Sequence, residues 1–466
     1  MLLQFITASD IGPKERKLIR AHVMKGKNLG RSRRQGRVFR ETKPVADHPG
    51  VIAGKAESLP VAGNMNSGRT LGLIRLFWHD LSLTSFPRPI HSDSRKLVYQ
   101  WLWVTAKVLY PPEFCSEVDL SHYPWYQYVL EDEAYFHCLL AVSASFEDRL
   151  HGKIAFSPRS LHHISRAYRL LNDRLSGPDA LSDQALAVVT LLTIYSYMHR
   201  HQSHGLTHFA GLCTMIRYRG GLAALAKQNI ALAQKPWRLS LEFALETGSM
   251  VAFSLTDMPD NGNLGIDTHS KPVPSSLPPS NKSRLGISLQ LSGMLEDIQQ
   301  LATILNSTSA RTRLNPMHYS EAVFSRLHRL LHFAPLGTRR LLSAFDDLVH
   351  LSLVAVMTTL MPEYGRHPTS NDLLSNMYRC AISRYTACVV TDPKTLLWAL
   401  FIASITVFHN DTQDWLCSIV SGLCSNMNLL TWDEVEAILS QLPWLRDLYS
   451  APAAKLWAKA RNGKDR

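Results

Sequence analysis

The sequence lacks the cysteine pattern of a zinc-binding or disulfide-built protein. Its seven cysteines are scattered along the chain, and no two of them form a C-x-x-C pair. An odd number of dispersed cysteines is typical of reduced, buried thiols in an intracellular protein. We therefore expect neither a disulfide framework nor a structural metal site.

Long hydrophobic runs are also missing. The longest ones, residues 185–198, 348–361 and 396–408, have roughly 14 residues at most, whereas a membrane-spanning helix needs about 20. The opening MLLQFITASD has no basic start and is a poor secretory signal. We expect an intracellular protein without membrane contact, in which the three runs form buried core helices.

Catalytic signatures are absent as well: the sequence contains no G-x-S-x-G elbow, no phosphate-binding glycine loop and no H-E-x-x-H motif. Four histidines, His199, His201, His204 and His208, lie close together but without a suitably spaced carboxylate. Gly205 is expected to break the helix between His204 and His208. The sequence thus predicts no enzyme activity, no cofactor and no metal.

Positive charge is present but unevenly distributed. The chain carries a net charge of +12 and has an isoelectric point near 9.4. Residues 1–43 hold twelve Lys and Arg against three Asp and Glu, a net charge of +9, which leaves only +3 for the other 423 residues. Binding to a polyanion must therefore begin at this N-terminal arm.

The arm has two basic clusters, Lys14–Lys17 and Arg31–Arg34, separated by thirteen residues. This spacing is close to that of a bipartite nuclear import signal, which predicts an import receptor as a partner and the nucleus as the location. The same bases could instead grip DNA phosphates weakly and without sequence preference, or form a solvated tail that nothing recognises. The candidate residues are Lys14, Arg16, Lys17, Arg20, Arg31, Arg33, Arg34 and Arg37.

Helical periodicity dominates the rest of the chain, and convincing strand alternation is absent. We predict an all-α protein, with a large multi-helix domain over residues 73–466. Residues 44–72 have the composition of a flexible linker, and residues 256–284, with five prolines, that of a disordered loop. The arm, residues 1–43, is expected to combine a short amphipathic helix with an arginine-rich, partly disordered segment.

Four stretches resemble the fungal-specific transcription factor domain family: Phe5–Gly26, Ser165–Tyr197, His208–Leu225 and Leu442–Ala460. The third carries an H-x-x-G-L-x-x-M-I-x-x-R-G-G motif. Its most distinctive residues are His208, Gly211, Arg219, Gly220 and Gly221. We interpret these five as structural residues, with Arg219 and the two glycines closing a helix.

The resemblance implies a fungal transcriptional regulator with an all-α regulatory domain. Many relatives carry an N-terminal zinc cluster of six cysteines that reads DNA, and no such pattern occurs in this sequence. We therefore expect this chain to act through other transcription regulators. A helical enzyme or small-molecule-binding protein of a fungal metabolic pathway is the alternative, and homo- or heterodimerisation is left open.

Overall fold

The computed structural model describes residues 86–87, 92–117, 124–150, 157–199, 202–258, 287–309, 312–361, 371–388, 390–408 and 414–462. All of them belong to one compact unit, Thr84–Arg466. The predicted arm, the linker and most of the predicted loop lie outside these residues. Of that loop, residues 256–258 are described, and Thr256 and Asp257 form part of a short 3-10 turn.

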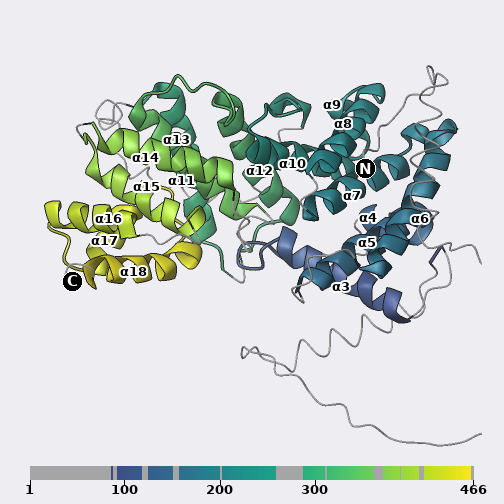
Figure 1. The fold of residues 1–466 in the computed structure, drawn as a ribbon, viewed down its shortest axis with the longest axis horizontal. Helices are drawn as coiled ribbons and strands as arrows, with labels where there is room; N and C mark the ends of the chain where they lie inside the picture. Colours follow the sequence, from purple (N-terminus) through teal and green to yellow (C-terminus); the bar gives the residue numbers. More distant parts are fainter. Residues whose placement is uncertain are drawn as a thin grey trace, which may run out of the picture. The chain divides into compact units, whose positions relative to one another are not determined.

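The prediction of an all-α protein is confirmed for the described residues, which contain sixteen α-helices and no strand (Figure 1). One isolated parallel bridge joins Cys115 to Leu314. The helices of the N-terminal half are α3 (Ser92–Leu109), α4 (Pro124–Glu131), α5 (Glu133–Leu150), α6 (Pro158–Leu175), α7 (Asp183–Met198), α8 (Gln202–Tyr218), α9 (Leu222–Gln228) and α10 (Ile230–Thr247). Those of the C-terminal half are α11 (Leu289–Asn306), α12 (Pro316–Phe333), α13 (Ala344–Leu360), α14 (Asp372–Thr386), α15 (Pro393–Thr406), α16 (Asp414–Asn426), α17 (Trp432–Leu439) and α18 (Arg446–Asn462).

Besides α10, three helices are buried on nearly all sides and form the core. They are α7, α13 and α15, which contain the three longest apolar runs of the sequence. A helix that is apolar on every side is stable only when other helices cover it. Accordingly α5 and α8 pack on α7, while α14 and α15 pack on α13, as their neighbouring ribbons show (Figure 1). The expectation that these runs are core helices is confirmed.

The two halves meet where α10 contacts α12 and α14. At the end of α10, Gly248 has φ +73°, and its carbonyl accepts a 2.8 Å hydrogen bond from the backbone N–H of Gly337. A Cβ atom on Gly248 would stand 2.5 Å from the Gly337 nitrogen. The side chain of Asn371 adds a 3.1 Å bond from its Nδ2 to the Leu245 carbonyl. The close approach therefore requires glycine at position 248.

One local prediction is wrong: Gly205 does not break a helix, because α8 runs through it. A Cβ atom there would lie 3.3 Å from Cζ of Phe243 in α10 and 3.8 Å from Cβ of Ser196 in α7. The glycine thus lets neighbouring helices approach α8 closely, and the cost of glycine in a helix is offset by that packing.

Candidate functional site

The motif that carries the family resemblance spans α8 and the turn into α9. Arg219 follows α8, and its guanidinium forms an ion pair with Asp183 in the first turn of α7. It also donates to the Gln228 side-chain oxygen at 2.5 Å and to the Leu181 carbonyl at 3.3 Å. Arg219 therefore joins the end of α8 to the start of α7 and the end of α9.

The network extends from Asp183 to the start of α10. Its second carboxylate oxygen accepts a 3.0 Å bond from Nδ2 of Asn229, whose Oδ1 caps α10 by accepting from the Leu232 N–H at 3.0 Å. Asn229 also contacts the hydroxyl of Tyr128 in α4 at 3.3 Å. Burial, with the nearby Asp183 carboxylate, raises the pKa of Tyr128 to about 12, so this hydroxyl stays neutral. Four helix ends are thereby tied together.

The two glycines after Arg219 change the chain direction. Gly220 and Gly221 have φ of +91° and +92°, values that side chains with a Cβ rarely adopt. The Gly221 N–H donates to the Ile216 carbonyl at 2.9 Å, which closes α8, and Gly221 is also the N-cap of α9. The glycine pair thus ends one helix and starts the next within two residues.

The first motif residue, His208, faces inward. It is 2% exposed, and its Nε2 lies 3.1 Å from the Tyr168 hydroxyl of α6. Burial, helped by His204, lowers the pKa of His208 to about 4, which keeps the imidazole neutral at physiological pH. Gly211 lies one turn further along α8 and is partly exposed. Among the described residues, no group of three or more His, Cys, Asp and Glu side chains could hold a metal ion.

A histidine pair that sequence reasoning did not identify lies between α5 and α6. Nδ1 of His137 and Nδ1 of His163 are 2.9 Å apart, so one ring donates a hydrogen to the other. Burial, together with His137, lowers the pKa of His163 to about 4. His162 is exposed and His163 is partly buried, because the two adjacent residues point in different directions on α6.

A serine and a histidine also approach each other, as a hydrolase would require. Nε2 of His199 lies 2.9 Å from Oγ of Ser145. The same Oγ donates to the Ala141 carbonyl and lies 2.8 Å from Oγ of Ser160. Ser145 is only 1% exposed, and the geometry makes His199 the hydrogen-bond donor, not the base. This contact is structural and does not support the enzyme alternative.

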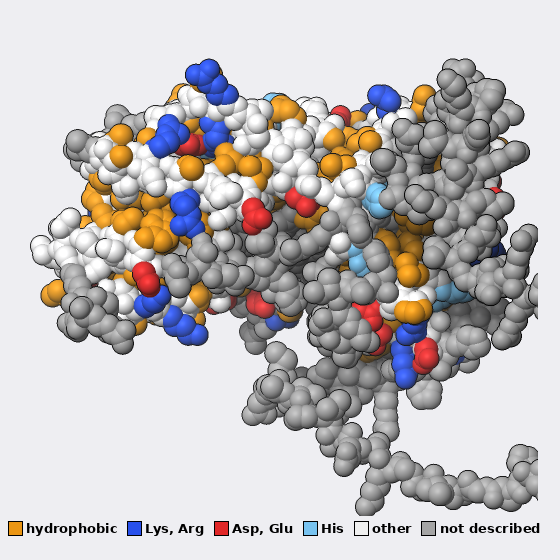
Figure 2. All heavy atoms as spheres, viewed as in Figure 1, with side chains coloured by type: hydrophobic (Ala, Val, Ile, Leu, Met, Phe, Trp, Pro, Cys, Tyr) orange, Lys and Arg blue, Asp and Glu red, His pale blue; other side chains and the backbone are white. Residues whose placement is uncertain are grey.

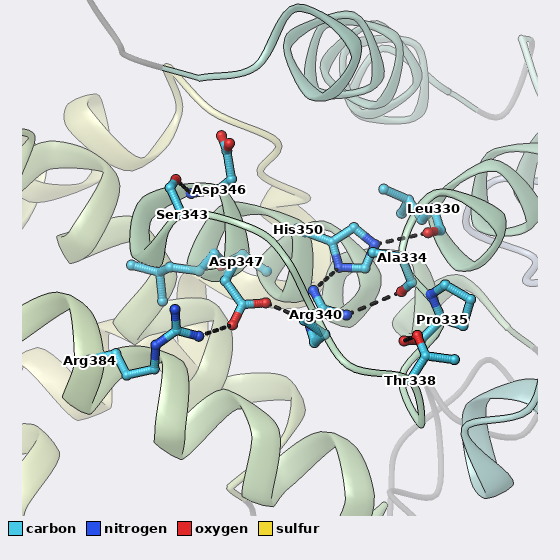
Figure 3. Close-up of polar contacts among 12 residues, drawn as sticks. Leu330, Ala334, Pro335, Thr338, Arg340, Ser343, Asp346, Asp347, His350 and Arg384 are labelled. Atoms are coloured by element: carbon cyan, nitrogen blue, oxygen red, sulfur yellow. Dashed lines mark hydrogen bonds and ion pairs between the residues drawn. The ribbon is translucent and has the colours of Figure 1, made fainter.

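The densest charged cluster lies in the C-terminal half (Figure 3). Asp347 of α13 accepts from Nε of Arg340 at 2.5 Å and from Nη1 of Arg384 in α14 at 3.0 Å. Arg340 also bonds to the Ala334 carbonyl at 3.1 Å and to Nδ1 of His350 at 2.8 Å. These groups satisfy one another, so the cluster fastens the loop after α12 onto α13 and α14.

The imidazole in this cluster is held in one protonation state. Nδ1 of His350 accepts from Arg340, so its Nε2 carries the hydrogen, which it donates to the Leu330 carbonyl at 2.9 Å (Figure 3). Burial, reinforced by the positive charge of Arg340, lowers the pKa of His350 to about 3. A proton on Nδ1 would face the guanidinium directly. His350 therefore works here only as a neutral ring.

The surface matches the low net charge of the body. On the face shown in Figure 2, the Lys and Arg side chains of the described residues are scattered, several of them beside Asp or Glu, and form no continuous basic area. None of the described helices is both long enough and apolar enough for a membrane span. The eight basic residues proposed for import or phosphate contacts lie outside the described residues.

Sequence reasoning found the motif residues but missed their partners. Asp183 lies 36 residues before Arg219, while Gln228 and Asn229 lie beyond the next turn. No spacing rule links these residues to Arg219. The N-cap positions of Ser182 and Asn229 were available signals, because Ser and Asn are preferred there.

The comparisons with known proteins agree with the motif. The family model described as Fungal specific transcription factor domain matches residues 124–442, which is more than half of the chain. The match includes α4 to α17 and the whole of the network around Arg219. No curated protein and no solved structure gives a significant match.

Proposed function

Because this chain belongs to the fungal-specific transcription factor domain family, we propose that it is a nuclear regulator that reaches promoters through DNA-reading partner proteins. The family match is the observation that carries the proposal, since this family consists of transcriptional regulators. Its helical body serves as the scaffold on which such partners dock.

Two features of the sequence support the route through partners. The 466 residues contain no C-x-x-C pair, so they hold no zinc cluster of the type that reads DNA in many relatives. The bases of the arm are separated by Gly26, Gly30 and Gly36. Base reading needs side chains held rigidly in a groove, and the sequence of this arm has no cysteine to bind a metal and is interrupted by these glycines. The arm is better suited to nuclear import and to weak phosphate contacts.

The test combines occupancy in cells with binding by the purified protein. The tagged full chain is cross-linked to chromatin and the bound fragments are sequenced. We expect enrichment at discrete promoters, while the purified chain binds these fragments and scrambled duplexes within about threefold of each other. Absence of promoter enrichment would show that the protein is not a promoter-bound regulator. Clear discrimination by the purified chain would instead show that it reads DNA by itself.

A matched variant separates binding at promoters from import into the nucleus. The full chain with Arg31, Arg33 and Arg34 changed to Ala is fused to an independent nuclear import signal. If the arm serves only for import, promoter occupancy returns with the added signal. If occupancy stays lost, the arm itself contributes to promoter binding and the partner-based route is wrong.

A further inference from the structure

On α10, which contacts α4, two positively charged side chains lie close to one negatively charged side chain. Arg238 is 7% exposed, and its Nε lies 3.0 Å from Oε1 of Glu242, which is 1% exposed. The contact is an ion pair that lacks the geometry of a hydrogen bond. Lys235 precedes Arg238 by one helical turn and adds a second positive charge. Within the described part of the chain, the side chain of Lys235 forms neither an ion pair nor a hydrogen bond.

Aromatic rings surround this second charge. Nζ of Lys235 lies 3.5 Å from the ring centroid of Trp125 in α4 and 5.8 Å from that of Trp101 in α3. Trp125 is 3% exposed and packs against Tyr135, whose buried hydroxyl has no hydrogen-bond partner within the described part of the chain. Even a desolvated cation–π contact gains only about 2 kcal/mol or slightly more, whereas removing an ammonium from water costs several. The indole rings alone therefore do not stabilise the charged lysine.

Two buried acidic groups of these elements have other partners. Glu242 pairs with Arg238, and Asp132, which follows α4, pairs with Arg174 and accepts from the Tyr135 N–H at 2.7 Å. Burial, with a further contribution from Arg238, lowers the pKa of Lys235 well below its ordinary value of 10.5. Lys235 and Trp101 are nevertheless both partly exposed as whole residues.

We propose that Lys235 binds a small organic monocarboxylate beside the partly exposed indole ring of Trp101. The single positive charge of Lys235 is balanced by the single negative charge of a carboxylate. A doubly charged phosphate would leave an excess of negative charge in an apolar surrounding, where the cost of burial rises steeply with charge. The indole ring of Trp101 favours an anion with a flat apolar body. The site concerns binding alone and does not depend on the proposed role in transcription.

The first experiment measures binding of benzoate to the full chain by calorimetry and by the shift of its melting temperature. Benzamide, the neutral counterpart, should bind at least about tenfold more weakly, because it lacks the charge that Lys235 pairs with. Lys235→Met should weaken benzoate binding by at least about tenfold, and Lys235→Arg by less than about threefold. Lys394→Met, at an exposed lysine of α15, should leave it unchanged.

Three results would overturn the proposal: no benzoate binding at millimolar concentrations, equal binding of benzoate and benzamide, or unchanged binding by Lys235→Met. Inorganic phosphate that binds as tightly as benzoate would show that the site takes a compact polyvalent anion, and would also contradict it.

A second readout uses the unaltered chain, so it holds even if Lys235→Met does not fold. Acetic anhydride acetylates the neutral amine of a lysine, and mass spectrometry follows each site. A bound carboxylate favours the ammonium and covers it, so benzoate should slow acetylation of Lys235 severalfold while benzamide does not. Lys394 should react at the same rate throughout. Acetylation of Lys235 that is insensitive to benzoate would contradict the site.

Discussion

At the scale of single residues, the fold depends on a few polar side chains that each hold several helices. Arg219 bonds to groups from α7 and α9 and to the Leu181 carbonyl, and Asp347 is held by two arginines. Such groups stabilise more by being mutually satisfied than by any one contact, because removing one partner leaves another unpaired.

Arg219→Ala should lower the free energy of unfolding by about 1–3 kcal/mol, since Asp183 then loses its partly buried ion-pair partner. Arg219→Lys should recover only part of it, because a lysine cannot contact both Asp183 and Gln228 in the same geometry. Urea denaturation measures both variants. Arg217→Ala, at an exposed arginine in the last turn of α8, is the control and should change stability by less than about 0.5 kcal/mol.

A double-mutant cycle of Arg219→Ala with Asp183→Asn should give a coupling energy of about 0.5–3 kcal/mol. Additive effects of the two substitutions would show that the ion pair contributes nothing to stability.

Three histidines predict the pH dependence of stability. The pKa values of His163 and His208 are near 4 and that of His350 near 3, all below the ordinary 6.5 of the unfolded chain. Below pH 6.5 the unfolded chain therefore binds more protons than the folded one, so stability is fully present above pH 6.5 and falls as the pH drops toward 4. Each such histidine contributes up to about 1.4 kcal/mol per pH unit to the slope.

His350→Gln removes one of these titrating groups. Denaturation at pH 7.5, 6.0 and 5.0 should show lower stability than the unaltered chain at pH 7.5, but a shallower decline toward pH 5.0. An unchanged slope would mean that His350 is protonated in the folded protein.

At the scale of elements, glycines decide how closely helices and loops approach. Gly248→Ala should destabilise the fold by more than about 2 kcal/mol, because the backbone has a positive φ and the new Cβ would stand 2.5 Å from the Gly337 nitrogen. Gly293→Ala in α11 is the matched control: a Cβ there meets nothing within 4 Å. It should stabilise by up to about 1 kcal/mol through helix propensity. Similar melting temperatures for the two variants would contradict the close approach.

At the scale of the whole molecule, charge is separated between the arm and a nearly neutral body. This predicts that changing Arg31, Arg33 and Arg34 to Ala moves a fluorescently tagged chain out of the nucleus, since one of two receptor contacts is lost. The nuclear-to-cytoplasmic ratio is the measurement. An unchanged ratio would contradict the import signal.

The same separation predicts weak binding to DNA that depends on the arm alone. With about six phosphate contacts, affinity should fall roughly a thousandfold between about 50 and 200 mM salt. Deletion of residues 1–43 should abolish binding in a fluorescence-anisotropy titration. Binding that survives the deletion would place a nucleic-acid surface on the helical body.

The sequence by itself determined the fold class, the buried helices and the family, because these depend on local periodicity and on motifs that are contiguous in the chain. Hydrophobic runs predicted α7, α13 and α15 as core, and the motif ending in Arg219 marked the close of α8. The local sequence pattern did not determine those helix ends that depend on packing against other helices. Gly205 was wrongly predicted to break a helix, because the advantage of glycine there comes from its contacts with Phe243 and Ser196 on other helices, which the local sequence does not show.

Only the tertiary structure decided which side chains act together. Asp347 lies 37 residues from Arg384, and Lys235 lies 110 residues from Trp125, so their contacts exist only once the helices pack. The pKa values of the buried histidines have the same origin, because burial is a property of the assembled core and not of the neighbouring sequence. Periodicity fixes which face of a helix is buried, but the partner it meets there is set by the packing of the whole domain.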